Sequence, residues 1–223
     1  MKGPFEAFRF LRALDAYSDR MASFTPISPA ALAELLAERA CARPGRVVMA
    51  ISAADAADPM DLAKRVVDTL RTAGRPAHAV ALHDFVRPAS LRLEHGRTDE
   101  QSYRSSWFDY DALDREVVSS LKERHRFLPR LWDETTDRSA RARRIDAADD
   151  HVIIVAGPML LGRGLTFDTT VDLRMSKGAL ERRTPSDHRW TIAPLLAHSA
   201  DASPGADIVV RFEHPDRPAL RVS

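Results

Sequence analysis

The stretch RVVMAISAADAADPMDLAKRVVDTLRTAG, residues 46–74, decides the expected fold. It opens with a continuous apolar and β-branched run, residues 47–51, which predicts a strand buried on both faces. A short loop follows, and then apolar residues at helical spacing predict an amphipathic helix that ends at Gly74. A second apolar run at residues 77–82 predicts another strand. This order of elements predicts a βαβ unit, and therefore a parallel sheet with a right-handed crossover.

The loop between this strand and helix has the position of a phosphate-binding loop. In the pattern G-x-x-x-x-G-K-[ST], the glycines let the backbone wrap the phosphates, the lysine reaches the terminal phosphates, and the hydroxyl holds magnesium. The chain departs from the two glycines, the lysine and the hydroxyl residue, where it has, in order, Ala53, Asp58, Pro59 and Met60. Asp58 and Pro59 instead predict a helix start that is capped by its own carboxylate. A phosphate would compete for the same N–H groups and would be repelled by Asp58 and Asp55.

The rest of the chain continues the α/β pattern. Apolar periodicity predicts helices at residues 28–42 and 111–124, and strands at 151–157, 168–175 and 207–212. Residues 1–26 carry apolar positions at helical spacing and predict an N-terminal amphipathic extension. Residues 27–223 are then expected to form one domain, which suits a chain of this length.

The composition excludes several classes of function. Lys and Arg number 33 and Asp and Glu number 32, so a net charge of +1 gives no basic field for DNA or RNA. The single cysteine, Cys41, excludes an internal disulfide and argues against a cysteine-based zinc site, so we predict no metal centre and a cytoplasmic location. No run approaches the roughly 18–20 apolar residues of a membrane helix. We therefore expect a small-molecule partner and no membrane; the oligomeric state stays open.

Four segments resemble the uridine kinase-like proteins of the P-loop nucleoside kinase group. They are ISAADAADPMDLA (51–63), LHDFVRP (82–88), FDYDAL (108–113) and VIIVAGPMLL (152–161), within a likeness that covers residues 27–217. The resemblance implies a three-layer α/β P-loop kinase-like fold with a central, mainly parallel sheet. It also implies transfer of phosphate from ATP, with magnesium, to a nucleoside hydroxyl.

The resemblance implies a catalytic base at the end of the second strand. Aligned through Phe85 of the family's D-x-F-[YH] motif, the base position holds His83, and Asp84 follows one residue later. Either side chain could accept a proton, but successive strand residues point to opposite faces, so at most one is well placed. The alternative is an exposed pair at a loop edge. Arg182 and Arg183 resemble the lid arginines that stabilise the transferred phosphoryl charge.

The acceptor side has its own counterpart residues. Trp132-Asp133 and Arg138 resemble the aromatic-Asp pair and the arginine that hold the pyrimidine nucleoside. A Trp beside a carboxylate could stack on a base and bind ribose hydroxyls. The alternative is that Trp132 covers an edge of the core.

Three functions remain open from the sequence. The first is a uridine kinase-like protein that binds a nucleoside or nucleotide but has lost the ordinary ATP phosphate and magnesium groups, including the acidic residue that Ala156 replaces. The second is an active, atypical nucleoside kinase, and only this alternative requires ATP and magnesium. The third is an interaction module that uses the N-terminal helix.

Overall fold

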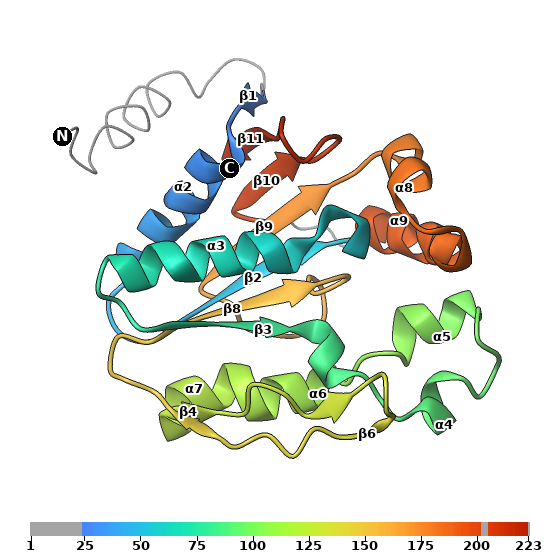
Figure 1. Ribbon diagram of the computed structural model, residues 1–223, viewed down its shortest axis with the longest axis horizontal. Coiled ribbons are helices and arrows are strands. Elements are labelled where there is room, and N and C mark those ends of the chain that lie inside the picture. The colour runs from blue at the N-terminus through green and yellow to red at the C-terminus, as the bar shows by residue number, and fades with distance from the viewer. Residues whose placement is uncertain (1–23, 202–204, 223) are drawn as a thin grey trace.

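The computed structural model describes residues 24–201 and 205–222 and has a central sheet between helical layers (Figure 1). The sheet is built from β1 (Thr25–Pro26), β2 (Val47–Ala53), β3 (Ala77–Ala81), β8 (Val152–Gly157), β9 (Thr169–Arg174), β10 (Ile208–Arg211) and β11 (Ala219–Val222). Their spatial order is β1-β11-β10-β9-β2-β8-β3. The strands from β10 to β3 run parallel, whereas β11 pairs antiparallel with β10 on one side and with β1 on the other. The predicted mainly parallel sheet is confirmed.

Helices cover both faces of the sheet and give it two hydrophobic cores. On one face, α2 (Pro29–Cys41) and α3 (Pro59–Thr72) pack against Met49 and Ile51 of β2. On the other face, Val48 and Ala50 pack against a continuous helical segment formed by α6 (Tyr110–Leu113), the π-helical turn η3 (Asp114–Val118) and α7 (Ser119–Arg124). Every residue of β2 is buried, as its uninterrupted apolar run predicts.

Local sequence signals set the residue at which α2 begins, and the buried Arg75 connects the end of α2 to the sheet. The Ser28 hydroxyl accepts a hydrogen bond from the Ala31 N–H at 3.1 Å, and a proline follows it, so α2 begins where the sequence predicts. The buried Arg75 guanidinium donates to backbone carbonyls of Ala40 (2.7 Å) and Gly45 (2.8 Å). It thereby joins the end of α2 to the start of β2.

Short elements gather at the carboxyl ends of the parallel strands (Figure 1). These are η1 (Asp55–Ala57), η2 (Leu82–Phe85), α4 (Ala89–Arg92), α5 (Glu100–Ser105), α8 (Lys177–Arg183), η4 (Ser186–Thr191) and α9 (Ile192–Asp201). The arginine-rich excursion that follows α7 forms two small antiparallel ladders. One pairs β4 (Arg126–Phe127) with β7 (Ile145–Asp146), and the other pairs β5 (Trp132–Asp133) with β6 (Arg138–Ser139).

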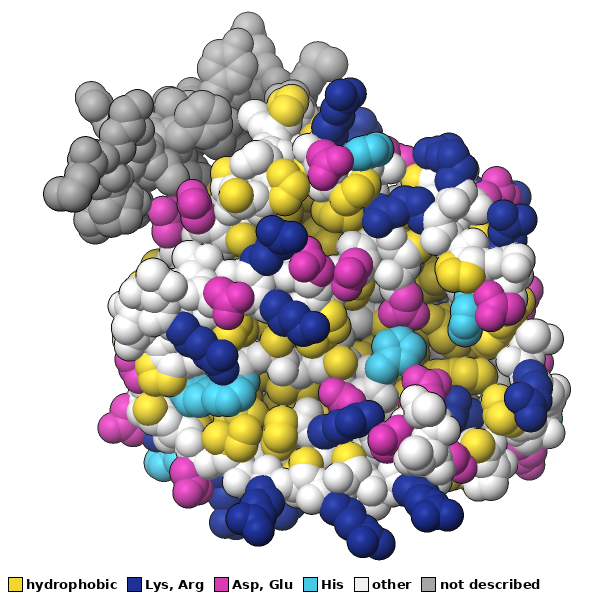
Figure 2. All heavy atoms as spheres, in the orientation of Figure 1, with side chains coloured by type: hydrophobic (Ala, Val, Ile, Leu, Met, Phe, Trp, Pro, Cys, Tyr) yellow, Lys and Arg dark blue, Asp and Glu magenta, His cyan; other side chains and the backbone are white. Residues whose placement is uncertain are grey.

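Residues 1–23 of the predicted N-terminal extension lie outside the described residues. Thr25 and Pro26, which follow them, pair with Leu220 and Ala219 at one edge of the sheet. Within the described ranges, no helix combines the length and apolar character that a membrane crossing needs. Figure 2 shows Lys and Arg interspersed with Asp and Glu over the viewed face, in keeping with the net charge of +1.

The end of β8 lies so close to η2 that it has no room for a side chain. A Cβ atom placed on Gly157 would lie 2.5 Å from the Leu82 Cβ. We expect Gly157→Ala to lower the free energy of unfolding by about 1–3 kcal/mol, because the strand or η2 must shift. Urea denaturation measures the change. Gly205→Ala is the matched control, since a Cβ there meets nothing within 4 Å; equal stability of the two variants would contradict the expectation.

Candidate functional site

The loop after β2 uses its own backbone groups to close itself. The N–H groups of Ala57 and Asp58 donate to the carbonyls of Ala54 and Asp55 at 2.8 and 2.9 Å. The Asp58 carboxylate caps α3 by accepting a hydrogen bond from the Asp61 N–H at 3.2 Å. A phosphate cradle needs free N–H groups that point at the ligand. In this loop, three of those groups already donate internally.

The residues at the four altered loop positions have structural contacts. Asp58 adopts the left-handed conformation, with φ of 50° and ψ of 59°. Pro59 is buried and supplies no N–H, and Met60 is half-buried against the first core. Ala53 ends β2 and is buried. The predicted helix start with its own carboxylate cap is therefore present.

His83 connects this loop to the β5–β6 hairpin. Its Nε2 lies 3.0 Å from Oδ1 of Asp55, and its Nδ1 lies 2.9 Å from Oε2 of Glu134. The other oxygen of Glu134 accepts from the guanidinium of Arg92 at 3.0 Å, and that guanidinium also lies over the Trp107 ring. The result is a chain of alternating charges that spans the edge of the sheet.

This geometry makes His83 a cation. Burial acts to lower the pKa of His83, but the charges and hydrogen bonds of Asp55 and Glu134 outweigh it and raise the pKa to about 10. A protonated imidazole has no free lone pair to accept a proton. Of the two candidate bases, the geometry therefore favours Asp84.

Asp84 lies in a separate ion pair beside the same hairpin. Its Oδ1 is 2.7 Å from Nε of Arg130, whose guanidinium also lies 3.5 Å from the Asp133 carboxylate. Burial raises the pKa of Asp84, and the Arg130 charge offsets only part of that rise. A raised pKa suits a general base, although Arg130 would first have to release the carboxylate.

The structure places the predicted acceptor residues together on one hairpin. Asp133 and Arg138 face each other across the β5–β6 ladder. The Trp132 indole N–H donates to Asp137 at 3.0 Å, and its ring packs against the second core. Asp133 also accepts a hydrogen bond from the Thr135 N–H at 3.0 Å, and Arg138 is exposed. These contacts give Trp132 and Asp133 structural roles, and no contact yet assigns them a ligand.

The predicted lid arginines lie at the end of α8. Arg182 is exposed, and the Arg183 guanidinium lies 5.8 Å from the centre of the Phe212 ring. The start of this helix is held by Glu213, which accepts from the Ser176 hydroxyl at 2.6 Å. Neither arginine lines the pocket described next.

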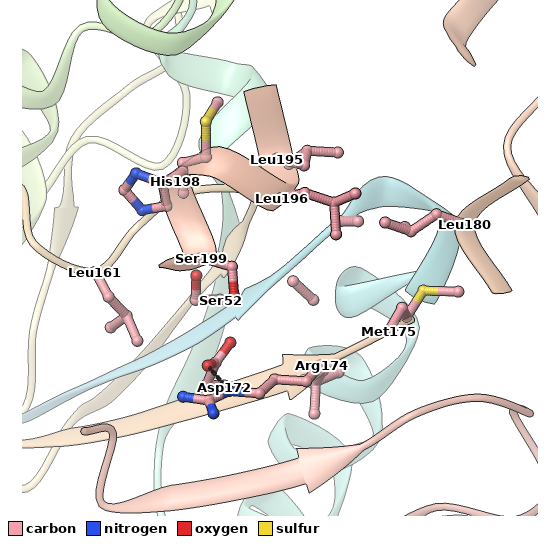
Figure 3. Close-up of a pocket in the computed structure, with 14 residues that line it drawn as sticks. Ser52, Leu161, Asp172, Arg174, Met175, Leu180, Leu195, Leu196, His198 and Ser199 are labelled. Atoms are coloured by element: carbon pink, nitrogen blue, oxygen red, sulfur yellow. Dashed lines mark hydrogen bonds and ion pairs between the residues drawn. The ribbon is translucent and has the colours of Figure 1, made fainter. Parts of the chain in front are cut away.

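A pocket opens where the ends of β2 and β9 meet α8 and α9 (Figure 3). Most of its wall is apolar, from Met159, Leu161, Met175, Leu180, Leu195 and Leu196. Its polar groups include Ser52 and Asp172, which are neighbours in the parallel ladder, and Arg174, which pairs with Asp172 at 2.7 Å. The site residues predicted from the sequence are all described by the structure, and of these only Ala53 lines the pocket.

Sequence reasoning missed this pocket because its residues form no motif. They come from distant strands and helices, and the ladder brings Ser52 and Asp172 together. His198 from α9 also lines the pocket, and burial together with the Arg163 charge lowers its pKa to about 4, so its ring is neutral. Among the described residues, no group of three or more His, Cys, Asp or Glu is arranged to hold a metal ion.

We expect the His83 ring to remain protonated at pH 8, where an ordinary histidine is neutral. Because its pKa of about 10 exceeds the ordinary value of 6.5, its stabilising contribution is complete below pH 6.5 and is lost as the pH rises through 10. An NMR titration of the ring signals measures the midpoint. Asp55→Asn should lower it, whereas Asp61→Asn should not, since Asp61 pairs with Arg65. A wild-type midpoint near 6.5 would contradict the expectation.

Comparison with known proteins shows the fold. No family model and no curated protein matches the chain. Among solved structures, a possible uridine kinase from Bacillus stearothermophilus matches with a TM-score of 0.64 and 20% identity, over 79% of this chain and 96% of that one. A candidate fructose transport system kinase from a Silicibacter species matches with a TM-score of 0.65 and 23% identity, over 82% and 98%. The chain therefore has the α/β fold of these kinase-like proteins, as its sequence motifs predict.

Proposed function

We propose that the protein binds a nucleoside or nucleotide at the carboxyl edge of its sheet and does not transfer phosphate by the ordinary ATP-magnesium mechanism. The observation that carries this proposal is the closed loop after β2. Its N–H groups donate within the loop, Asp58 caps α3, and Asp55 pairs with His83. The residues present do not fit a conventional ATP-magnesium site.

The changes affect the phosphate-binding, magnesium-binding and base positions that phosphoryl transfer needs. Such transfer depends almost wholly on positioning and neutralisation of charge. Pro59 replaces the lysine, Met60 replaces the magnesium hydroxyl, and Ala156 replaces the acidic magnesium partner. His83, at the base position, is a cation. Loss of one preorganised electrostatic contact costs about 2.7–4 kcal/mol in the transition state, and even non-additive losses of this size leave little ordinary activity.

The pocket under α8 and α9 supports retained binding. Its apolar wall suits the face of a base or sugar ring, and the Asp172–Arg174 pair, with Ser52 beside it, offers hydrogen bonds at one side. Open parallel sheets bind ligands at their carboxyl edge, which is where this pocket lies. Uridine and D-fructose are the first probes, because the two solved neighbours are described as kinases for uridine and for fructose transport.

A second candidate function follows from Asp84. Its raised pKa and its place after β3 favour a base for an atypical kinase that transfers phosphate from ATP to a nucleoside hydroxyl. In that case Arg130 leaves Asp84 when the acceptor binds. A phosphorylation assay with ATP, magnesium and uridine distinguishes this candidate from the first, because only the second candidate forms the phosphorylated product.

Calorimetric titration tests binding before chemistry. We expect uridine to bind the full-length protein and ATP with magnesium to give no heat at micromolar concentrations; D-fructose serves as the comparison probe. The reason is that the Asp58 carboxylate accepts from an N–H group that a phosphate would use, and the negative charge of Asp55 would repel a phosphate. Micromolar affinity for ATP, about −8 kcal/mol, would overturn the closed-loop argument.

Restoration of the loop tests the same argument by gain of function. We expect Asp58→Gly, Pro59→Lys and Met60→Thr together to raise ATP affinity about tenfold or more, since a charge-assisted contact contributes about 1.5–3 kcal/mol. The control carries Asp58→Gly and Met60→Thr without the lysine and should gain less. Calorimetry measures both. If the triple variant folds but still does not bind ATP, the surrounding cleft no longer accepts a nucleotide.

A further inference from the structure

One buried hydroxyl beside the site has no partner. Tyr103, on α5, is 3% exposed, and its hydroxyl finds no hydrogen-bond partner among the described residues. Its ring packs edge-on against Trp107 and Trp190, with ring centres 5.5 and 5.2 Å away. Buried polar groups are almost always paired, and an unpaired one is costly to maintain. A buried hydroxyl of this kind therefore indicates a function other than packing in the unliganded protein.

Tyr103 lies one aromatic ring away from His83, because both rings pack edge-on against Phe108, with ring centres 6.0 and 5.3 Å from it. Burial raises the pKa of Tyr103 well above its usual range, and the charges of Asp55, Tyr110 and Glu134 raise it further. The phenol is therefore neutral and can both donate and accept a hydrogen bond. Asp55 and Glu134 are the two carboxylates that His83 joins. The His83 bridge and the Tyr103 hydroxyl thus belong to one region.

The same region borders the pocket under α8 and α9. Ala54 lines that pocket, and Asp55 is its neighbour in the chain. Met159 also lines it, and the Met159 carbonyl accepts a hydrogen bond from the Tyr110 hydroxyl at 3.1 Å. The Asp55–His83 contact therefore lies next to the wall of the pocket. The Asp55 and His83 side chains are 54% and 38% exposed, so their contact can open without disruption of the core.

We infer that the Tyr103 hydroxyl is a ligand contact, covered in the unliganded protein and reached when the Asp55–His83 contact opens. The inference rests on the proposed function and specifies its ligand. Tyr103 packs against the rings of Trp107 and Trp190, where burial of a charged group is costly, so the group that reaches its hydroxyl is an uncharged hydroxyl. A nucleoside or a free sugar fits this chemistry, whereas the same molecule with a phosphate on that group does not.

Tyr103→Phe tests the inference in the full-length chain by calorimetry with uridine and D-fructose. We expect the variant to bind the probe that the wild type binds about three- to tenfold more weakly, the usual effect of one lost hydrogen bond. Its melting temperature should equal or exceed that of the wild type, because the lost hydroxyl has no hydrogen-bond partner in the part of the chain that the structure describes. Uridine monophosphate or D-fructose 1-phosphate should bind the wild type more weakly than the unphosphorylated probe.

Ser120→Ala is the matched control. Its hydroxyl is also buried without a partner among the described residues, but it lies on α7 in the helical layer. This variant should keep both the melting temperature and the probe affinity of the wild type.

The outcomes separate the inference from the proposed function. If Tyr103→Phe binds the probe as tightly as the wild type, the inference is overturned and the proposed function stands. A lowered melting temperature of Tyr103→Phe would also overturn it, because the hydroxyl would then have an internal role. Tighter binding of the phosphorylated probe would contradict the assignment of an uncharged ligand. A wild type that does not bind uridine would overturn the proposed function, and the inference with it.

Discussion

The pairing of β2 with parallel strands on both sides is the constraint on which the structure depends. Its backbone bonds to β8 along one edge and to β9 along the other, and both of its faces are covered by helices. Because β2 is paired on both sides and covered on both faces, the chain that follows it can continue only beyond the carboxyl end of the strand. The loop after β2 therefore emerges at the carboxyl edge, next to the ends of β3, β8 and β9. The polar groups of the candidate site meet there because the loops after parallel strands all emerge at the same end of the sheet.

At that edge, the loop in the position of a phosphate-binding loop connects α3 to His83 and, through His83, to the β5–β6 hairpin. Asp58 caps α3, and Asp55 reaches across to His83, which in turn holds Glu134 of the hairpin. The positive charge of His83 is thus neutralised by carboxylates of the chain and is not available to a phosphate. The His83 cation stabilises the closed arrangement, and the neighbouring Tyr103 hydroxyl has no hydrogen-bond partner among the described residues. The ionic groups of the closed state are thus paired, whereas this buried hydroxyl next to them is not.

Much of the fold could be predicted because its signals are local. The apolar run of β2, the Ser28 cap of α2 and the Asp58-Pro59 start of α3 each depend on residues a few positions apart. The motifs in chain order also predicted the kinase-like fold. The candidate site was less predictable. The resemblance assigned Trp132 and Asp133 to a nucleoside site, but the internal partner of each side chain depends on hairpin geometry that no motif specifies.

The sequence by itself determined the parallel α/β arrangement and the loss of the phosphate-loop residues, because periodicity and residue identity suffice for both. Only the tertiary structure decided the protonation of His83, since its two carboxylate partners lie 28 and 51 positions away in the chain. It likewise decided the pocket, where the ladder sets Ser52 beside Asp172, and the burial of Tyr103. Electrostatic and desolvation effects depend on distance in space, and a single sequence does not contain those distances.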